Sequence, residues 1–297
     1  MFQDHITPHR TANAMLQDTS TFYFLLVEGI KDLPTYKKLI SEGVQIKVSF
    51  GKHKMKEIDE LLKKRGFENY LGIRDADFLR LKNNSKFNQN YCGNIFATDE
   101  HDSESMIIAS DALTDFINHI SHESNTKTFS SQYGSIRDLC YRLCYPIACL
   151  RLASKKYDLG LAFKPLKPEG NKVKFKKFIC EKEFIYLGHE KMINTLVEYS
   201  TNRGGNIPPR EDILKALDKI ISENYSLYDI VNGHDLSEVL YIICKKGLKI
   251  QNKLLSDAGC VEDMLRMTYN MEYFKRTKIY GDICDHQNKI QKPILRE

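Results

Sequence analysis

The beginning of the chain alternates between short apolar segments and segments with helical periodicity, and this alternation constrains the fold most strongly. Apolar runs lie at 22–27, 44–50, 69–74 and 94–97. Residues 32–43 and 53–66 lie between the first three runs, and the second of these segments ends in Lys-Lys-Arg-Gly, a typical helix C-terminus. The order β-α-β-α-β-β-α predicts an α/β fold with a mostly parallel, Rossmann-like sheet flanked by helices.

The remainder of the chain predicts further modules. We expect residues 1–125 to form the α/β core and residues 126–225 to form a largely helical insertion with a basic hairpin. Residues 226–297 are expected to return to the sheet edge and to end in helices. This return depends on interpreting YDIV at 228–231 as a further strand of the same sheet.

Composition limits the class of protein. The 297 residues carry a formal net charge of +5, which is compatible with a phosphate-bearing partner but does not require one. The apolar runs are too short to span a bilayer, and the N-terminus has no secretory apolar region, so we expect a cytoplasmic protein. The eight cysteines lack zinc-site spacing and are expected to be buried free thiols. A Walker A motif is absent from the sequence, so any nucleotide-driven control must come from a partner.

Acidic residues follow three of the predicted strands. Glu28 follows the first strand, and Asp75 and Asp77 follow the third. The fourth strand is followed by the acids Asp99, Glu100, Asp102 and Glu104. The carboxyl ends of parallel strands meet at one edge of a sheet, where clustered carboxylates need a positive charge among them. An all-oxygen set favours Mg²⁺ or Mn²⁺. On a regular strand, Asp75 and Asp77 would point to the same face and converge on one site.

These motifs resemble a known family. LLVEGIKD and GIRDADF, with two strand–helix alternations between them, are similar to the TOPRIM domain of topoisomerases, primases and overcoming-lysogenization-defect nucleases. That signature has a glutamate after the first strand and Asp-x-Asp after the third, and Glu28, Asp75 and Asp77 fall on it. The detailed resemblance covers about 100 residues.

A narrower resemblance covers nearly the whole chain. VEGIKDLPTYKKL, RDADF, TDEHDSESM and NGHDLSEVL together resemble the AriB family, the TOPRIM effector subunits of PARIS anti-phage defence systems. The resemblance implies a toxic, homodimeric endoribonuclease that cleaves tRNA. It also implies a separate AriA-like ATPase that holds the effector in check until a phage triggers its release.

We expect Glu28, Asp75 and Asp77 to hold Mg²⁺ beside a scissile phosphodiester. Asp102 and Glu104 are candidates for a second ion, although either is also explained as an acid that complements the start of a helix. Within the same segment, His101 is a candidate general base or phosphate contact, and an ordinary surface histidine is the alternative. Asp99 and Glu100 are weaker candidates. For Asp32, the alternatives are a helix cap and a group in the outer coordination sphere.

Basic residues suggest contacts with nucleic acid. Lys52 follows the second strand at the same edge, where it would bind phosphate or be solvated. The segment 164–177 interleaves lysines with aromatic residues, a pattern that suits RNA but is equally typical of a solvated hairpin. Its candidate contacts are Lys164, Lys167, Lys172, Lys174, Lys176 and Lys177.

A possible second cluster lies in NGHDLSE, where His234, Asp235 and Glu238 would join the sheet edge if YDIV were a strand. The alternative is that Asp235 caps the following helix and Glu238 completes a capping box.

Other functions remain open from the sequence. A TOPRIM DNA endonuclease would use the same chemistry, because the choice between RNA and DNA depends on contacts with the 2′-hydroxyl. A non-catalytic module that docks on an ATPase is the alternative outside enzymes. A primase is disfavoured because the zinc-ribbon cysteines are absent from the sequence, and a topoisomerase because the chain is short.

Overall fold

The computed structural model describes residues 6–81, 93–166, 170–201, 203 and 205–296. The chain divides into two compact units. Unit 1 comprises Met1–Ala112 and Leu265–Glu297, and unit 2 comprises Leu113–Met264. Among the described residues, none of the helices is both long enough and apolar enough to cross a bilayer.

Unit 1 contains a four-stranded parallel sheet with the strand order β2-β1-β3-β4. Its strands are β1 (Tyr23–Val27), β2 (Val44–Val48), β3 (Tyr70–Arg74) and β4 (Ile95–Ala97). Every residue of β1 and β3 is buried, as expected for the central strands of a sheet covered on both faces. The predicted α/β class and the parallel sheet are confirmed.

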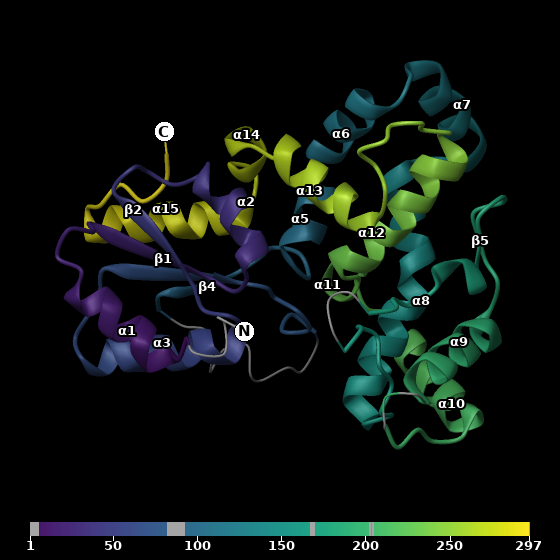
Figure 1. Cartoon of the computed structure of the whole chain (residues 1–297), viewed down its shortest axis with the longest axis horizontal. Helices are drawn as coiled ribbons and strands as arrows, with labels where there is room; N and C mark the ends of the chain where they lie inside the picture. Colours follow the sequence, from purple (N-terminus) through teal and green to yellow (C-terminus); the bar gives the residue numbers. More distant parts are fainter. Residues whose placement is uncertain (1–5, 82–92, 167–169, 202, 204, 297) are drawn as a thin grey trace. The chain divides into compact units, whose positions relative to one another are not determined.

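Helices cover both faces of this sheet (Figure 1). The helices of unit 1 are α1 (Pro8–Gln17), α2 (Leu33–Lys37), α3 (Lys52–Lys64), α5 (Ser103–Ala109), α14 (Met271–Phe274) and α15 (Lys278–Ile290). On one face, Phe24 and Leu26 join a core cluster with residues of α1 and α3. On the other face, the Tyr23 hydroxyl lies 2.8 Å from Nε2 of His286 in α15. Because side chains alternate along β1, this single strand anchors both helical layers.

Unit 2 is mainly helical. Its elements are α6 (Ala112–Ile120), α7 (Glu123–Tyr133), α8 (Ile136–Tyr157), the hairpin β5 (Ile179–Cys180) and β6 (Ile185–Tyr186), α9 (His189–Thr201), α10 (Arg210–Ser222), α11 (Leu227–Ile230), α12 (Gly233–Ile242) and α13 (Ala258–Thr268), which runs on into unit 1. The long helix α8 forms its centre, and α10, α11 and α12 pack against it. The end of α12 widens into a π-helical turn, Ile243–Gly247.

The predicted strand at 228–231 is wrong, whereas Leu265–Glu297 does return to the unit that contains the sheet. Residues 227–230 form the short helix α11 instead of a strand. The ring of Tyr228 packs at a tilt against Tyr141 of α8 with 4.8 Å between the ring centroids, and Ile230 is fully buried. Packing of these two side chains therefore favours a helical turn on α8, and the segment belongs to unit 2. The compact helical unit runs from Leu113 to Met264, whereas the predicted insertion was 126–225.

Candidate metal centre at the carboxyl edge of the sheet

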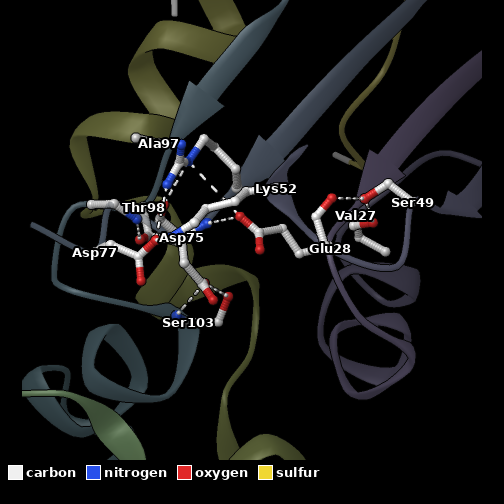
Figure 2. A network of polar contacts seen from close by, with 12 residues as sticks. Val27, Glu28, Ser49, Lys52, Asp75, Asp77, Ala97, Thr98 and Ser103 are labelled. Atoms are coloured by element: carbon white, nitrogen blue, oxygen red, sulfur yellow. Dashed lines mark hydrogen bonds and ion pairs between the residues drawn. The ribbon is translucent and has the colours of Figure 1, made fainter. Parts of the chain in front are cut away.

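Residues that follow three strands meet at the carboxyl edge of the sheet (Figure 2). Glu28 directly follows β1, Asp75 directly follows β3, and Lys52 begins the helix that comes after β2. The Glu28 carboxylate Oε1 accepts a hydrogen bond of 3.2 Å from the backbone N–H of Asp75. The structure therefore brings together the acids that the sequence separates by 47 positions.

The loop after β3 is held against the loop after β4. The N–H of Ala76 donates to the Thr98 hydroxyl at 3.0 Å, and the N–H of Asp77 donates to the carbonyl of His101 at 2.6 Å. Asp77 has a φ of 49°, a left-handed conformation that is uncommon outside glycine but tolerated by aspartate. The backbone in this loop is consequently fixed by partners on both sides.

The expectation that Asp75 and Asp77 extend from one strand face is wrong. β3 ends at Arg74, and the left-handed Asp77 turns the chain away from extended geometry. Oδ1 of Asp75 accepts from the N–H of Ser103 at 3.1 Å, at the start of α5. Oδ2 of Asp77 accepts from Nζ of Lys52 at 2.6 Å. The two carboxylates therefore take different partners.

Arg74 is a central residue that sequence reasoning missed. Its side chain is 2% exposed, its Nε donates to the carbonyl of Asp75 at 2.6 Å, and its Nη2 donates to Oδ2 of Asp77 at 3.1 Å. The same Nε lies 3.8 Å from Oε1 of Glu28. An arginine at the end of an apolar strand, directly before two acids, was the available signal. It places a permanent positive charge beneath the acidic edge.

Burial and crowding shift the pKa values of these carboxyl groups. Burial raises the pKa of Glu28 to about 7, and Asp77 adds to the shift while Arg74 and Lys52 oppose it. Burial, followed by the charge of Glu104, raises the pKa of Asp32 to about 6. The pKa of Asp75 is raised well above its ordinary value by burial and then by the nearby charges of Asp102 and Glu28.

Asp77 behaves in the opposite way. Burial acts to raise its pKa, but the hydrogen bond and charge of Lys52, followed by the charges of His101 and Arg74, bring the pKa below its ordinary value. Asp77 is therefore compensated by side chains of the protein, whereas burial and neighbouring carboxylates disfavour the charged forms of Glu28 and Asp75.

The donor set fits a hard divalent cation. Glu28 and Asp75 carry mostly buried carboxyl groups, and the backbone N–H of Asp75 donates to the Glu28 carboxylate. Carboxylate oxygen is the ligand type that Mg²⁺ and Mn²⁺ prefer. A cation would also favour the charged forms that burial and mutual repulsion oppose.

The acids after β4 have structural partners of their own. Asp102 caps α5, since its Oδ1 accepts from the N–H of Ser105 at 2.8 Å. Glu104, in the first turn of that helix, forms a buried ion pair with Arg266. Asp99 accepts from the N–H of Ile279 at 2.9 Å and so holds the start of α15. Glu100 accepts through its backbone carbonyl from the Thr98 hydroxyl at 2.9 Å.

The structure decides between the alternatives that the sequence left open for the side chains of His101 and Asp32. His101 is 5% exposed and packs edge-on against Phe78 at 4.9 Å, so its interpretation as a surface histidine is wrong. Oδ2 of Asp32 accepts from the N–H of Gly29 at 2.8 Å, while α2 shows no side-chain cap from Asp32. Asp32 thus completes the capping box of the short 3₁₀ helix Ile30–Asp32, which follows Glu28.

The basic segment of unit 2 is a surface strip, and its described part is not a hairpin. The lysines of the strip that the structure describes are exposed, while Val173 and Phe175 between them are buried. Phe175 is therefore part of the core and is not exposed for stacking on a base. Lys177 pairs with Glu198 at 2.8 Å. The exposed members are Lys164, Lys172, Lys174, Lys176 and Lys177, and Lys167 lies outside the described residues.

The predicted second cluster depended on a strand at YDIV, and residues 227–230 are helical instead. Asp235 makes a bidentate ion pair with Arg151 of α8, with both N–O distances 2.7 Å. The helix cap is Asn232, whose Oδ1 accepts from the N–H of Asp235 at 2.8 Å, so the predicted cap is also wrong.

The two other members of that predicted cluster have separate partners within unit 2. Nδ1 of His234 lies 2.7 Å from Oε1 of Glu262. Glu238 lies 3.5 Å from Nζ of Lys172, which is more than half exposed. These pairs are local contacts between helices and loops of unit 2.

Comparison with protein-family models and with curated proteins gave no match to this chain. Any function proposed for the chain therefore rests on the geometry of the site and on the sequence motifs.

Proposed function

We propose that the chain is a divalent-metal-dependent phosphodiesterase of the TOPRIM type. The observation that carries the proposal is the hydrogen bond from the Asp75 amide to the Glu28 carboxylate, which joins two partly buried acidic residues from separate strand ends. A strand-end position at the carboxyl edge of an open α/β sheet is also where such folds bind their ligands.

Glu28 and Asp75 would hold the cation, which when bound polarises a phosphoryl oxygen and stabilises the leaving oxygen. Arg74 is too buried to reach a substrate, and its contacts assign it to orienting Asp77 and balancing Glu28. Lys52 is one-third exposed and remains the side chain placed to donate to a phosphate oxygen. For this contact, Lys52 must exchange its hydrogen bond with Asp77 for one with the substrate.

His101 contributes through its backbone carbonyl, which fixes the N–H of Asp77. Asp102 and Glu104 already serve a helix cap and an ion pair. Both roles support the position of Ser103, whose N–H donates to Asp75. We therefore assign these two acids to positioning the first cation rather than to holding a second one.

RNA is the substrate we propose, with tRNA as the specific class. Its support is the resemblance of VEGIKDLPTYKKL, RDADF, TDEHDSESM and NGHDLSEVL to the AriB family. On the same basis we propose a toxic effector of anti-phage defence that acts as a homodimer and is restrained by an AriA-like ATPase. DNA cleavage by the same centre is the competing function.

The test uses the purified chain with total tRNA and, separately, plasmid DNA, with Mg²⁺ or EDTA. We expect Mg²⁺-dependent cleavage of tRNA that Glu28→Gln reduces by about 10²-fold or more, because the variant loses a charged ligand but keeps its shape. Glu42→Gln, at an exposed position of unit 1, is the matched control and should retain activity. Cleavage of DNA alone would overturn the RNA assignment. Cleavage of neither substrate, or cleavage that persists in Glu28→Gln, would overturn the phosphodiesterase centre.

A further inference from the structure

Unit 2 contains a pocket of about 280 Å³ that the sheet-edge chemistry does not use. Helix α7, the turn of the β5–β6 hairpin, the π-helical turn after α12 and Lys249 form its walls. Its volume is close to the lower end of the range for small-ligand pockets, about 300 Å³. The aromatic and basic lining residues are Phe129, Tyr133, Phe184, Lys182, Lys246 and Lys249.

Three aromatic rings build one wall of the pocket. Phe129 lies 4.8 Å from Tyr133 and 5.2 Å from Phe184, and Tyr133 lies 5.0 Å from Phe184. Phe129 and Phe184 are nearly fully buried, so the rings hold one another in place while Tyr133 remains partly accessible. Tyr133 is therefore the ring that a flat, apolar group such as a nucleobase can contact, and the two buried rings fix its position.

The backbone around the pocket is in unusual conformations. Phe184 has a φ of 51° and Lys249 a φ of 53°, both in the left-handed region that bulky residues rarely occupy. A Cβ at Gly247 would lie 2.3 Å from the ring of Phe129, so only glycine allows this close approach. Gly247 also ends the π-helical turn, and such turns are frequent at functional sites. Strain at several positions around one pocket favours a functional site over a packing defect.

The charge of the pocket selects an anion. Lys182, Lys246 and Lys249 are exposed, and the described lining includes no aspartate or glutamate. Polar lining groups come from Asn125, whose Nδ2 donates to the carbonyl of Leu248 at 3.2 Å, and from Gln132 and Thr128. Glu181 and Glu183 adjoin Lys182 in sequence but do not line the pocket. An aromatic wall with a basic rim is complementary to a base joined to a phosphate.

We propose that this pocket binds one unpaired nucleotide of a single-stranded nucleic acid, with its base against the ring of Tyr133 and its phosphates on the lysine rim. The pocket extends the proposed nuclease function by adding a contact for unpaired substrate. The binding proposal rests on the proposed nuclease function only where it takes the single strand to be RNA. An acidic peptide is the competing ligand, and the aromatic wall favours the nucleotide.

The experiment measures binding without cleavage. The full chain is titrated in EDTA against a fluorescent single-stranded RNA oligonucleotide, a duplex of the same sequence, and poly-glutamate. We expect the single strand to bind at least about tenfold more tightly than the duplex. The double variant Lys246→Ala/Lys249→Ala should weaken single-strand binding by about tenfold. It should also lower the slope of log K against log salt concentration by about 1.4, which corresponds to the loss of two phosphate contacts.

A second variant tests the pocket by filling it. Thr128→Trp, at an exposed lining position of α7, should weaken binding without removing a charge. Lys215→Ala/Lys219→Ala changes the same charge on the exposed face of α10 and should leave binding unchanged. Equal binding by wild type and both pocket variants, equal loss in the α10 control, or equal affinity for poly-glutamate would overturn the proposal. Because this experiment measures binding and not cleavage, its result does not depend on whether the nuclease assay succeeds.

Discussion

Two sets of acids in this molecule have similar sequence surroundings but opposite electrostatic situations. At the carboxyl edge of the sheet, burial and neighbouring carboxylates raise the pKa values of Glu28 and Asp75. In α12, the buried Asp235 is matched by a bidentate contact from Arg151. The negative charges of Glu28 and Asp75 are therefore disfavoured, whereas the charge of Asp235 is paired with an arginine.

The difference shows what distinguishes a candidate cation site from a structural ion pair. Both sets were predicted from the sequence as acids of the sheet edge, so their spacing alone does not separate them. Their positions do, because parallel strand ends bring acids from distant segments to one edge, where Arg74 and Lys52 mainly compensate Asp77. The helix-borne Asp235 meets one arginine and is satisfied. The predictions below use this contrast.

The largest expected difference is in stability. Asp235→Asn should lower the free energy of unfolding by about 3–5 kcal/mol, because it leaves the mostly buried Arg151 without its carboxylate. Asp75→Asn, made in EDTA, should leave stability unchanged or higher, since it removes a repelled buried charge and keeps an oxygen to accept from Ser103. Urea unfolding measures both variants. A large loss in Asp75→Asn with none in Asp235→Asn would reverse the assignment of the two sets.

A second difference is in pH dependence. Glu28 has a pKa of about 7 in the metal-free folded chain, against an ordinary value of 4.5, so the folded state holds its proton more tightly than the unfolded state does. Its contribution to stability is therefore fully present below about pH 4.5 and is lost as the pH rises through 7. The contribution amounts to about 3 kcal/mol.

Glu28→Gln isolates this contribution. In EDTA, the stability of wild type relative to Glu28→Gln should fall as the pH is raised from 4.5 to 7.5, while the Glu42→Gln control follows wild type. Saturating Mg²⁺ should remove most of the fall. A wild-type curve parallel to that of Glu28→Gln would show that this carboxyl is not perturbed.

A smaller effect is expected at Lys52. Lys52→Met removes the 2.6 Å contact with Asp77 and should reduce cleavage by about 10- to 100-fold, the usual effect of losing a group that orients a metal site. Lys56→Met, on the same helix and 3.8 Å from the carboxylate of the exposed Glu60, is the matched control. Equal activity of the two variants would show that Lys52 is a solvated lysine without a role in cleavage.

Much of unit 1 follows from local sequence. The apolar runs at 22–27 and 69–74 are buried strands because central parallel strands are covered on both faces. Helix α3 follows the predicted spacing, with Met55, Ile58 and Leu62 buried. Local patterns specify these elements because the apolar residues that set the strand or helix period are the same residues that become buried.

Other features depend on long-range contacts that a sequence pattern does not encode. YDIV has strand-like residues, yet Tyr228 packs on Tyr141 and the segment is helical. The compensation of Asp77 by Arg74 depends on the left-handed turn that follows β3. Asp235 meets an arginine 84 positions away, and no local signal names that partner.

Titration calorimetry with Mn²⁺ tests the central claim most directly. Wild type should bind the ion, Asp75→Asn and Glu28→Gln should lose most of that affinity, and Glu238→Gln in α12 should bind like wild type. Unaltered Mn²⁺ binding in Asp75→Asn and Glu28→Gln, or loss of binding only in Glu238→Gln, would contradict a cation site at the carboxyl edge of the sheet.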